Sequence, residues 1–215
     1  MAAPDEHAHV LTYNPTAASQ LPYLVCFQCG LAERALRSAR DERFNVASTP
    51  ETYGRVQRLV REKKTIPEEM VATYSQMITD GLGTQLRSMP VGIRIDRALY
   101  QSQPELRGMQ RVIAERQMKE SVGCLSPSIK AMAPELIFNA SVGMNAALAL
   151  EWSRIWNDDV HVVPYRLAGH APVGERLLAS LDAIPDTPHH DRELVSSWAE
   201  ILGVAGLYEI GPIGL

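Results

Sequence analysis

Residues 21–34 have the sequence LPYLVCFQCGLAER, and a stretch rich in Arg, Asp and Glu continues from them to about Arg43. Apolar residues recur in this segment three and four positions apart, which is the spacing of one face of an α-helix. The segment therefore predicts a helix from Leu21 to about Arg43, unbroken between Tyr23 and Arg37. Phe27 and Leu31 share a face of that helix, because they are about one turn apart.

Helix-start signals that contain proline recur along the rest of the chain, and they favour a mainly helical fold. Ser48-Thr49-Pro50-Glu51 has a capping residue before a first-turn proline, and Thr65-Ile66-Pro67-Glu68 has the spacing of a capping box. Further helices are expected from Thr65 to a break at Asp80-Gly81-Leu82-Gly83, from Ser102 to about Ser121, from Ala133 to about Asn157, from about Gly174 to Ala183 and from Asp191 to Leu202.

Strand signals are sparse. His9 to Tyr13 and the β-branched run Val160 to Tyr165 are expected to form two short strands. The sequence thus predicts a mainly α protein of the α+β class, with minor β-strands. Residues 1–157 are expected to form a mainly helical domain, and residues 158–215 a small C-terminal lobe of strand and helices that packs on it as one unit.

Composition argues against several classes of function. The chain has 215 residues, of which 46% are hydrophobic, and its net charge is −4, so it has no basic excess for nucleic acid or an anionic membrane surface. Its most apolar window, Leu136 to Trp156, contains Asn139, Glu151 and Arg154, which predicts a buried helix rather than a membrane span. Three cysteines argue against a disulfide framework and favour a reducing cytoplasm. The acidic, polar N-terminus is unlike a signal peptide.

The segment 21–34 also resembles the active-site helix of the His-Glu-x-x-His zinc peptidases. In that motif two His side chains four positions apart bind zinc, and the Glu acts as general base. The matching positions here hold Phe27, Gln28 and Leu31, around Gly30. Residues 81–100, GLGTQLRSMPVGIRIDRALY, resemble the second block of a group of bacterial cytosolic peptidase-like proteins with this motif, so the resemblance covers roughly the first 120 residues. It implies that Asp96 matches the third, acidic ligand.

The replaced positions remove the chemistry that the resemblance would imply. Phe27 and Leu31 have no lone pair for zinc, and the Gln28 amide does not accept a proton from water at neutral pH. Asp96 alone does not hold a transition metal, so we expect no metal and no cofactor, with Phe27 and Leu31 filling the former metal cavity. The resemblance therefore implies a pseudoenzyme, a catalytically inactive interaction, regulatory or accessory subunit that binds a protein or peptide, with a homo-oligomer as a further option.

An enzyme with a non-standard site is the alternative. Its most specific form is a zinc hydrolase with rearranged ligands, for which Cys26, Cys29 and Asp96 are candidates. The Cys-x-x-Cys pair lies inside the predicted helix rather than at its N-terminus, and no second pair exists, so buried structural thiols are favoured. Other side chains that the fold could assemble into such a site are Gln28, Glu33, Tyr100 and the histidines, of which His7, His9, His189 and His190 are expected on the surface and His161 and His170 flank the second predicted strand.

Overall fold

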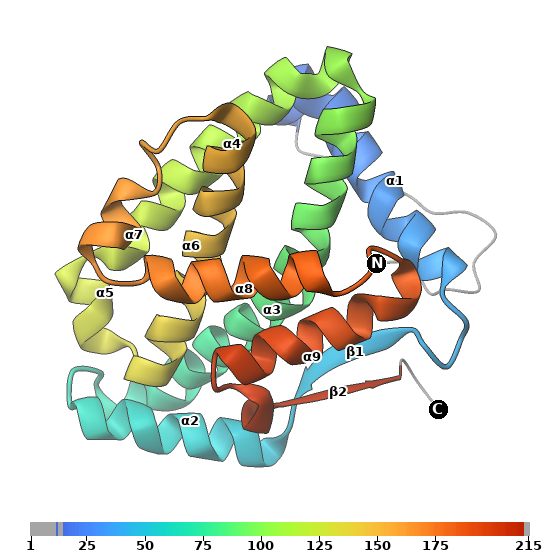
Figure 1. The fold of residues 1–215 in the computed structure, drawn as a ribbon. Helices are drawn as coiled ribbons and strands as arrows, with labels where there is room; N and C mark the ends of the chain where they lie inside the picture. Colours follow the sequence, from blue (N-terminus) through green and yellow to red (C-terminus); the bar gives the residue numbers. More distant parts are fainter. Residues whose placement is uncertain (1–11, 13–14, 213–215) are drawn as a thin grey trace.

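The computed structural model describes Thr12 and residues 15–212 of the chain, and this part is mainly helical, as predicted. Within the described residues there are nine α-helices, of which one is central and the other eight lie around it, and two short strands pair at one side (Figure 1). The elements are α1 Leu21–Arg37, β1 Phe44–Ser48, α2 Pro50–Lys63, α3 Glu68–Ser102, α4 Arg107–Val122, α5 Pro127–Met132, α6 Glu135–Trp156, α7 Val163–Leu167, α8 Ala171–Ala183, α9 Asp191–Ile201 and β2 Tyr208–Pro212.

Local start signals place most of these helices correctly. The Thr49 side chain accepts a hydrogen bond from the Thr52 backbone N–H at 3.2 Å, and Pro50 follows in the first turn of α2. Helices α3 and α6 begin directly after Pro67 and Pro134. Each of these starts depends on a few neighbouring residues, which is why the sequence alone predicts it.

The predicted break at residues 80–83 is wrong, because α3 continues through both glycines to Ser102. Gly83 serves packing instead: a Cβ at this position would lie 2.9 Å from Cε1 of Tyr208, so only glycine lets the Tyr208 ring approach the helix. Tertiary packing of this kind outweighs the low helix propensity of glycine. The predicted extension of α1 to Arg43 is also wrong, since α1 ends at Arg37.

The predicted strand at Val160 to Tyr165 is wrong as well. This segment forms a turn and the short helix α7, in which Pro164 occupies the first turn and Val162 and Tyr165 are buried. The strands that do form were not predicted: β1 and β2 pair antiparallel, from Phe44 with Pro212 to Ser48 with Tyr208. The predicted strand His9 to Tyr13 lies outside the described residues except for Thr12, which belongs to no helix or strand.

Helix α6 forms the centre of the core, with nearly every residue from Ile137 to Trp152 buried. Helix α8 crosses it at very short range, since a Cβ on Gly174 would lie 2.8 Å from the backbone nitrogen of Ala147. Small residues at a crossing let two helix backbones approach, and the surrounding large side chains then interdigitate. The described C-terminal residues 158–212 thus pack on α6 through α8 and pair with β1 through β2.

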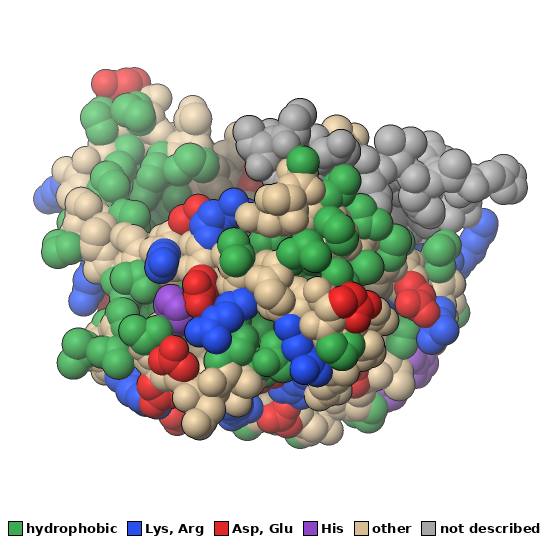
Figure 2. Space-filling view, turned by 90° about the horizontal axis from the view of Figure 1, so that it is seen from above, with side chains coloured by type: hydrophobic (Ala, Val, Ile, Leu, Met, Phe, Trp, Pro, Cys, Tyr) green, Lys and Arg blue, Asp and Glu red, His purple; other side chains and the backbone are tan. Residues whose placement is uncertain are grey.

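Helix α1 lies at the edge of the molecule and packs mainly on α3 (Figure 1). Tyr23 is its only buried residue, while Leu24, Val25 and Phe27 are half-buried and Leu36 is exposed. Figure 2 looks down on the molecule from above, and hydrophobic side chains form groups there between charged ones. The segment that gave the strongest sequence signal is therefore a peripheral helix rather than the core.

Candidate functional site

The junction of α1 and α3 is where the sequence places the remnant peptidase site. The two helices approach over glycines: a Cβ on Gly30 would lie 2.9 Å from Cγ2 of Ile95, and one on Gly92 would lie 3.3 Å from Cζ of Phe27. The hydroxyl of Tyr23 donates a hydrogen bond of 2.5 Å to Oδ1 of Asp96. Asp96 therefore lies on a helix that packs against α1. Its carboxylate contacts Tyr23, however, and the α3 residue that lies against Phe27 is Gly92.

Asp96 has an environment that perturbs its ionisation. Burial raises the pKa of the Asp96 carboxyl to about 6, and the hydrogen bonds from Tyr23 and Gln110 limit that rise. Gln110 donates from Nε2 to both the backbone oxygen and Oδ1 of Asp96, at 2.8 and 3.0 Å. Burial and the nearby Asp96 charge also raise the pKa of Tyr23 above its usual value. The carboxylate thus links α1, α3 and α4.

The structure does not assemble the alternative zinc site from its candidate residues. Gln28 and Cys29 are exposed, Cys26 and Leu31 are half-buried, and Asp96 is engaged with Tyr23. In the part of the chain that the structure describes, no group of three or more His, Cys, Asp or Glu is positioned to hold a metal ion.

The other candidate side chains lie in separate surroundings. Glu33 pairs with Arg37 on the surface of α1, and Tyr100 packs edge-on against Trp152 with the Arg107 guanidinium over its ring. The four described histidines meet four different neighbours: His161 contacts Trp156, His170 contacts Phe138, His189 pairs with Glu42 and His190 bonds to Thr187. His7 and His9 lie outside the described residues.

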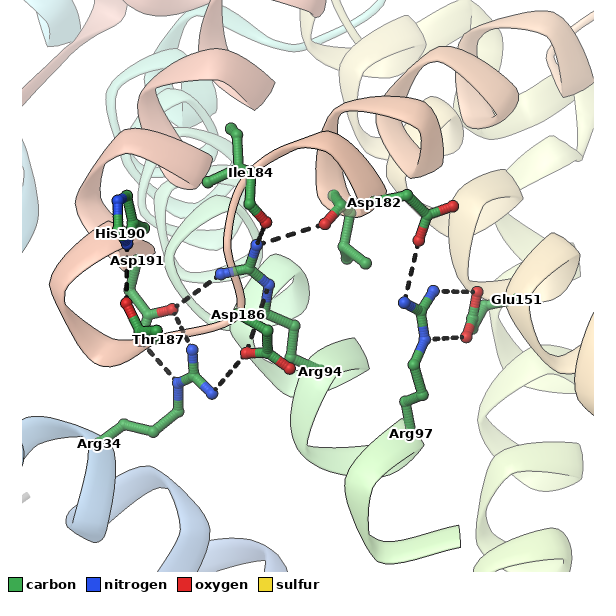
Figure 3. Close-up of polar contacts among 11 residues, drawn as sticks. Arg34, Arg94, Arg97, Glu151, Asp182, Ile184, Asp186, Thr187, His190 and Asp191 are labelled. Atoms are coloured by element: carbon green, nitrogen blue, oxygen red, sulfur yellow. Dashed lines mark hydrogen bonds and ion pairs between the residues drawn. The ribbon is translucent and has the colours of Figure 1, made fainter. Parts of the chain in front are cut away.

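A clamp of charged residues, which the sequence did not predict, ties α1 and α3 to the turn before α9 and to the first residue of α9 (Figure 3). Arg34 forms a bidentate pair with Asp191 at 2.6 and 2.7 Å and reaches Asp186 at 2.8 Å. Arg94, only 1% exposed, lies 3.4 Å from Asp191 and donates to the backbone oxygen of Ile184 at 2.6 Å. Burial lowers the pKa of Arg94, although both carboxylates oppose this effect.

A second clamp joins α3 to α6 and α8. Arg97 forms a bidentate pair with Glu151 at 2.7 and 3.0 Å and also contacts Asp182 at 2.9 Å (Figure 3). Glu151 is buried, so its charge needs this partner. In both clamps each arginine is paired with carboxylates, although Nε of Arg94 is buried without a hydrogen-bond partner. This pairing indicates a structural role. The available signal was the presence of Arg94 and Arg97 within the apolar run of α3.

An apolar groove lies between the first half of α3, α5 and the first half of α6. It encloses about 340 Å³ and is open on one side. The polar groups at its wall are the Gln85 and Ser141 side chains, which bond to each other at 2.8 Å. The side chains and glycine that line it are Tyr74, Met77, Ile78, Gly81, Leu82, Gln85, Cys124, Ile129, Met132, Ala133, Ile137, Phe138, Ser141 and Val142.

Flexible apolar side chains stand at the rim of this apolar groove. Met77 is 60% exposed, Ile129 of α5 is exposed, and Met132 is half-buried. Tyr74, Ile78, Gly81 and Gln85 follow one another on the same face of α3, since they are three or four residues apart. The groove is therefore a long helix face beside a short helix, a shape and chemistry suited to an apolar occupant.

Comparison with known proteins adds no relative: no family model matches the chain, and neither a curated protein nor a solved structure is significantly similar to it. None of the helices in the described part of the chain has the length and apolar character that crossing a membrane requires.

Proposed function

We propose that this protein acts without catalysis, by holding an apolar helical segment of a protein partner in the apolar groove. The observation that supports this function is the groove itself, a lining of about 340 Å³ that is almost wholly apolar and open to solvent. A soluble surface that leaves such a lining uncovered is typical of an interaction site. The three free cysteines fit a reducing cytoplasm as its location.

The shape of the groove favours a helix as the occupant. Helices bind in grooves by placing apolar anchors at i, i+3 or i+4 and i+7. The face of α3 beside α5 is long enough to receive such a series of anchors. Methionine side chains such as Met77 and Met132 are unbranched and polarisable, so they adapt to anchors of different shape. Gln85 and Ser141 offer hydrogen-bonding atoms to a polar group on the bound segment.

We further propose that α1 keeps the frame of a zinc-peptidase helix whose working side chains have been replaced. This part of the proposal rests on Phe27, Gln28 and Leu31 at the motif positions and on the packing of Phe27 where Gly92 lets α3 approach. The alternative of a zinc hydrolase with rearranged ligands has no supporting observation, because Cys29 is exposed and Asp96 bonds to Tyr23 and Gln110.

A single substitution can close the groove without disturbing the protein around it. Gly81 lines the groove, and a Cβ at this position would meet no atom within 4 Å. Phenylalanine at position 81 therefore fills the groove from its open side. Gly108, on the exposed surface of α4, has equally open surroundings, so Gly108→Phe is the matched control.

The test is a selection of helical peptides against the protein from a displayed library, followed by fluorescence anisotropy of the selected peptides. We expect peptides with apolar residues at i and i+4 to bind the parent and Gly108→Phe alike, and to bind Gly81→Phe about tenfold more weakly or worse. Selected peptides that bind Gly81→Phe as well as the parent, or a selection that yields no such peptides, would overturn the proposed function.

A further inference from the structure

We infer that the partner of the apolar groove is a second copy of this chain, which inserts an apolar knob formed by Val160, Val163 and Leu167. The inference rests on the proposed function, because it names the occupant of the same groove. In the resulting dimer each copy supplies one knob and one groove.

The knob is unusually exposed for an apolar segment. Leu167 is 85% exposed, Val160 60% and Val163 45%, so three of the eight exposed large hydrophobic side chains among the described residues fall within eight positions. Leaving such side chains in water forgoes the favourable free energy of burying them. The cluster therefore has the character of a surface that another surface covers.

The knob also has the spacing that the groove requires. Val163 and Leu167 lie one turn apart in the short helix α7, and Val160 lies in the turn just before it. Two apolar side chains one turn apart are part of the anchor pattern of a helix that binds in a groove. The chain itself thus displays a segment of the class that the groove accommodates.

The knob and the groove lie next to each other on the molecule. The His170 ring, three residues after Leu167, packs against Phe138 with ring centroids 5.8 Å apart, and Phe138 lines the groove. Burial and the nearby Lys130 of α5 together lower the pKa of His170, so α5 faces the turn that follows α7. Figure 1 shows α7 and α5 at the same side of the fold.

This arrangement makes the surface complementary to itself. A two-fold axis between a knob and an adjacent groove brings each knob opposite the other copy's groove, so both contacts form at once and the assembly closes as a dimer. A knob on the far side of the molecule would instead give an open chain of copies.

Analytical ultracentrifugation over a concentration series tests the dimer. We expect the parent to dimerise, and we expect Leu167→Glu and Gly81→Phe each to weaken self-association about tenfold or more, by charging the knob and by filling the groove. Leu36→Glu and Gly108→Phe are the controls, since both change exposed positions outside the patch and should leave the dimer intact. Circular dichroism verifies that each variant is folded.

Mixing the two patch variants tests how the copies meet. Gly81→Phe keeps its knob and Leu167→Glu keeps its groove, so a mixture should recover one of the two contacts and form a heterodimer. Failure to recover any association would show that the knob does not enter the groove and would overturn the inference. A parent that stays monomeric throughout the series, or a dimer that neither substitution weakens, would also overturn it. The peptide assay tests the groove independently of self-association. A protein that stays monomeric but binds helical peptides would contradict the dimer and still support the proposed function.

Discussion

The crossing of α6 and α8 and the junction of α1 and α3 both bring helices together over glycine, but different forces hold them. At the crossing, Gly174 faces the backbone of Ala146 and Ala147, and the surrounding side chains are buried. At the junction, the glycines face side chains rather than backbone, and polar contacts hold the two ends of α1: Tyr23 with Asp96, and Arg34 with Asp191.

The difference predicts how each region responds to perturbation. Where backbone packs directly against backbone, neither helix can shift to accept a larger side chain. The α6–α8 crossing therefore determines whether the domain folds at all. A peripheral helix with few buried apolar contacts opens at lower free energy than the rest of a domain. We therefore expect damage at the crossing to be global, and damage at the junction to depend on which partner is left unpaired.

Gly174→Val should give the largest effect. Its Cβ would lie 2.8 Å from the Ala147 nitrogen and 2.9 Å from the Ala146 carbonyl carbon, so the α8 backbone must move away from α6. We expect a loss of more than about 5 kcal/mol in the free energy of unfolding, or no stable fold. Urea denaturation measures this. Gly54→Val in α2, where a Cβ meets nothing within 4 Å, should change stability by less than about 0.5 kcal/mol. Equal effects at both positions would refute the rigid crossing.

Asp191→Ala should give the next largest effect. Its carboxylate serves both Arg34 and the buried Arg94, and removing it leaves the Arg94 charge short of a partner in the interior. Breaking a buried ion pair from one side costs about 3 kcal/mol or more. Asp182→Ala is the control, because this half-exposed carboxylate pairs with Arg97 near the surface and should cost less than about 1 kcal/mol. Chemical denaturation of both variants would show whether the two losses differ as expected.

Asp96→Asn tests the α1–α3 junction through the pH dependence of the free energy of unfolding. Burial raises the pKa of Asp96 from 3.8 to about 6, so the folded state binds this proton more tightly than the unfolded state does. The stability associated with the proton is present at low pH and is lost as the pH rises through about 6. Relative to the parent, we expect Asp96→Asn to remove a decline on the order of 3 kcal/mol across this window.

The measurement for Asp96 is a set of denaturation curves between the two pKa values and neutral pH. Other carboxylates contribute slopes of their own, so the quantity of interest is the difference between parent and variant. A difference that does not change with pH would mean that the Asp96 carboxyl titrates normally and that α1 does not shield it.

Parts of this fold follow from local sequence. The starts of α2, α3 and α6 depend on a capping residue or a proline within a few positions, and all three were predicted. The continuation of α3 through Gly83 depends on Tyr208, which is distant in the chain. The strand β1 exists because β2 pairs with it, and neither has a strong pattern of its own. A local sequence pattern does not predict interactions between residues that are so far apart in the chain.

The candidate sites divide in the same way. The remnant-site residues Phe27, Gln28 and Leu31 could be named because a motif has a fixed spacing. The apolar groove is lined by residues of α3, α5 and α6, so no single stretch of the sequence predicts it. Val160 to Tyr165 illustrates the opposite error, since its β-branched residues predicted a strand while burial of Val162 and Tyr165 stabilises a turn and α7.

The combined change Phe27→His, Gln28→Glu and Leu31→His tests the peptidase frame at the junction, with the smallest expected change in stability. It rebuilds two metal ligands and a base at the required spacing, and Asp96 would supply the third ligand. We expect about one zinc ion per chain by isothermal titration, against none for the parent. Zinc at about tenfold over its dissociation constant should then stabilise the variant by about 1.4 kcal/mol.

Asp96 itself provides the internal control for that experiment. Its carboxylate accepts the hydrogen bond of Tyr23, so adding Tyr23→Phe to the combined variant should free the ligand and strengthen zinc binding. Adding Asp96→Asn instead should weaken binding, because an amide is a poorer zinc ligand than a carboxylate. A folded variant that takes up no zinc, with or without Tyr23, would mean that the α1–α3 junction never had the geometry of a metal site. The resemblance of residues 21–34 to a peptidase helix would then be accidental, and α1 would be a peripheral helix held by its polar ends alone.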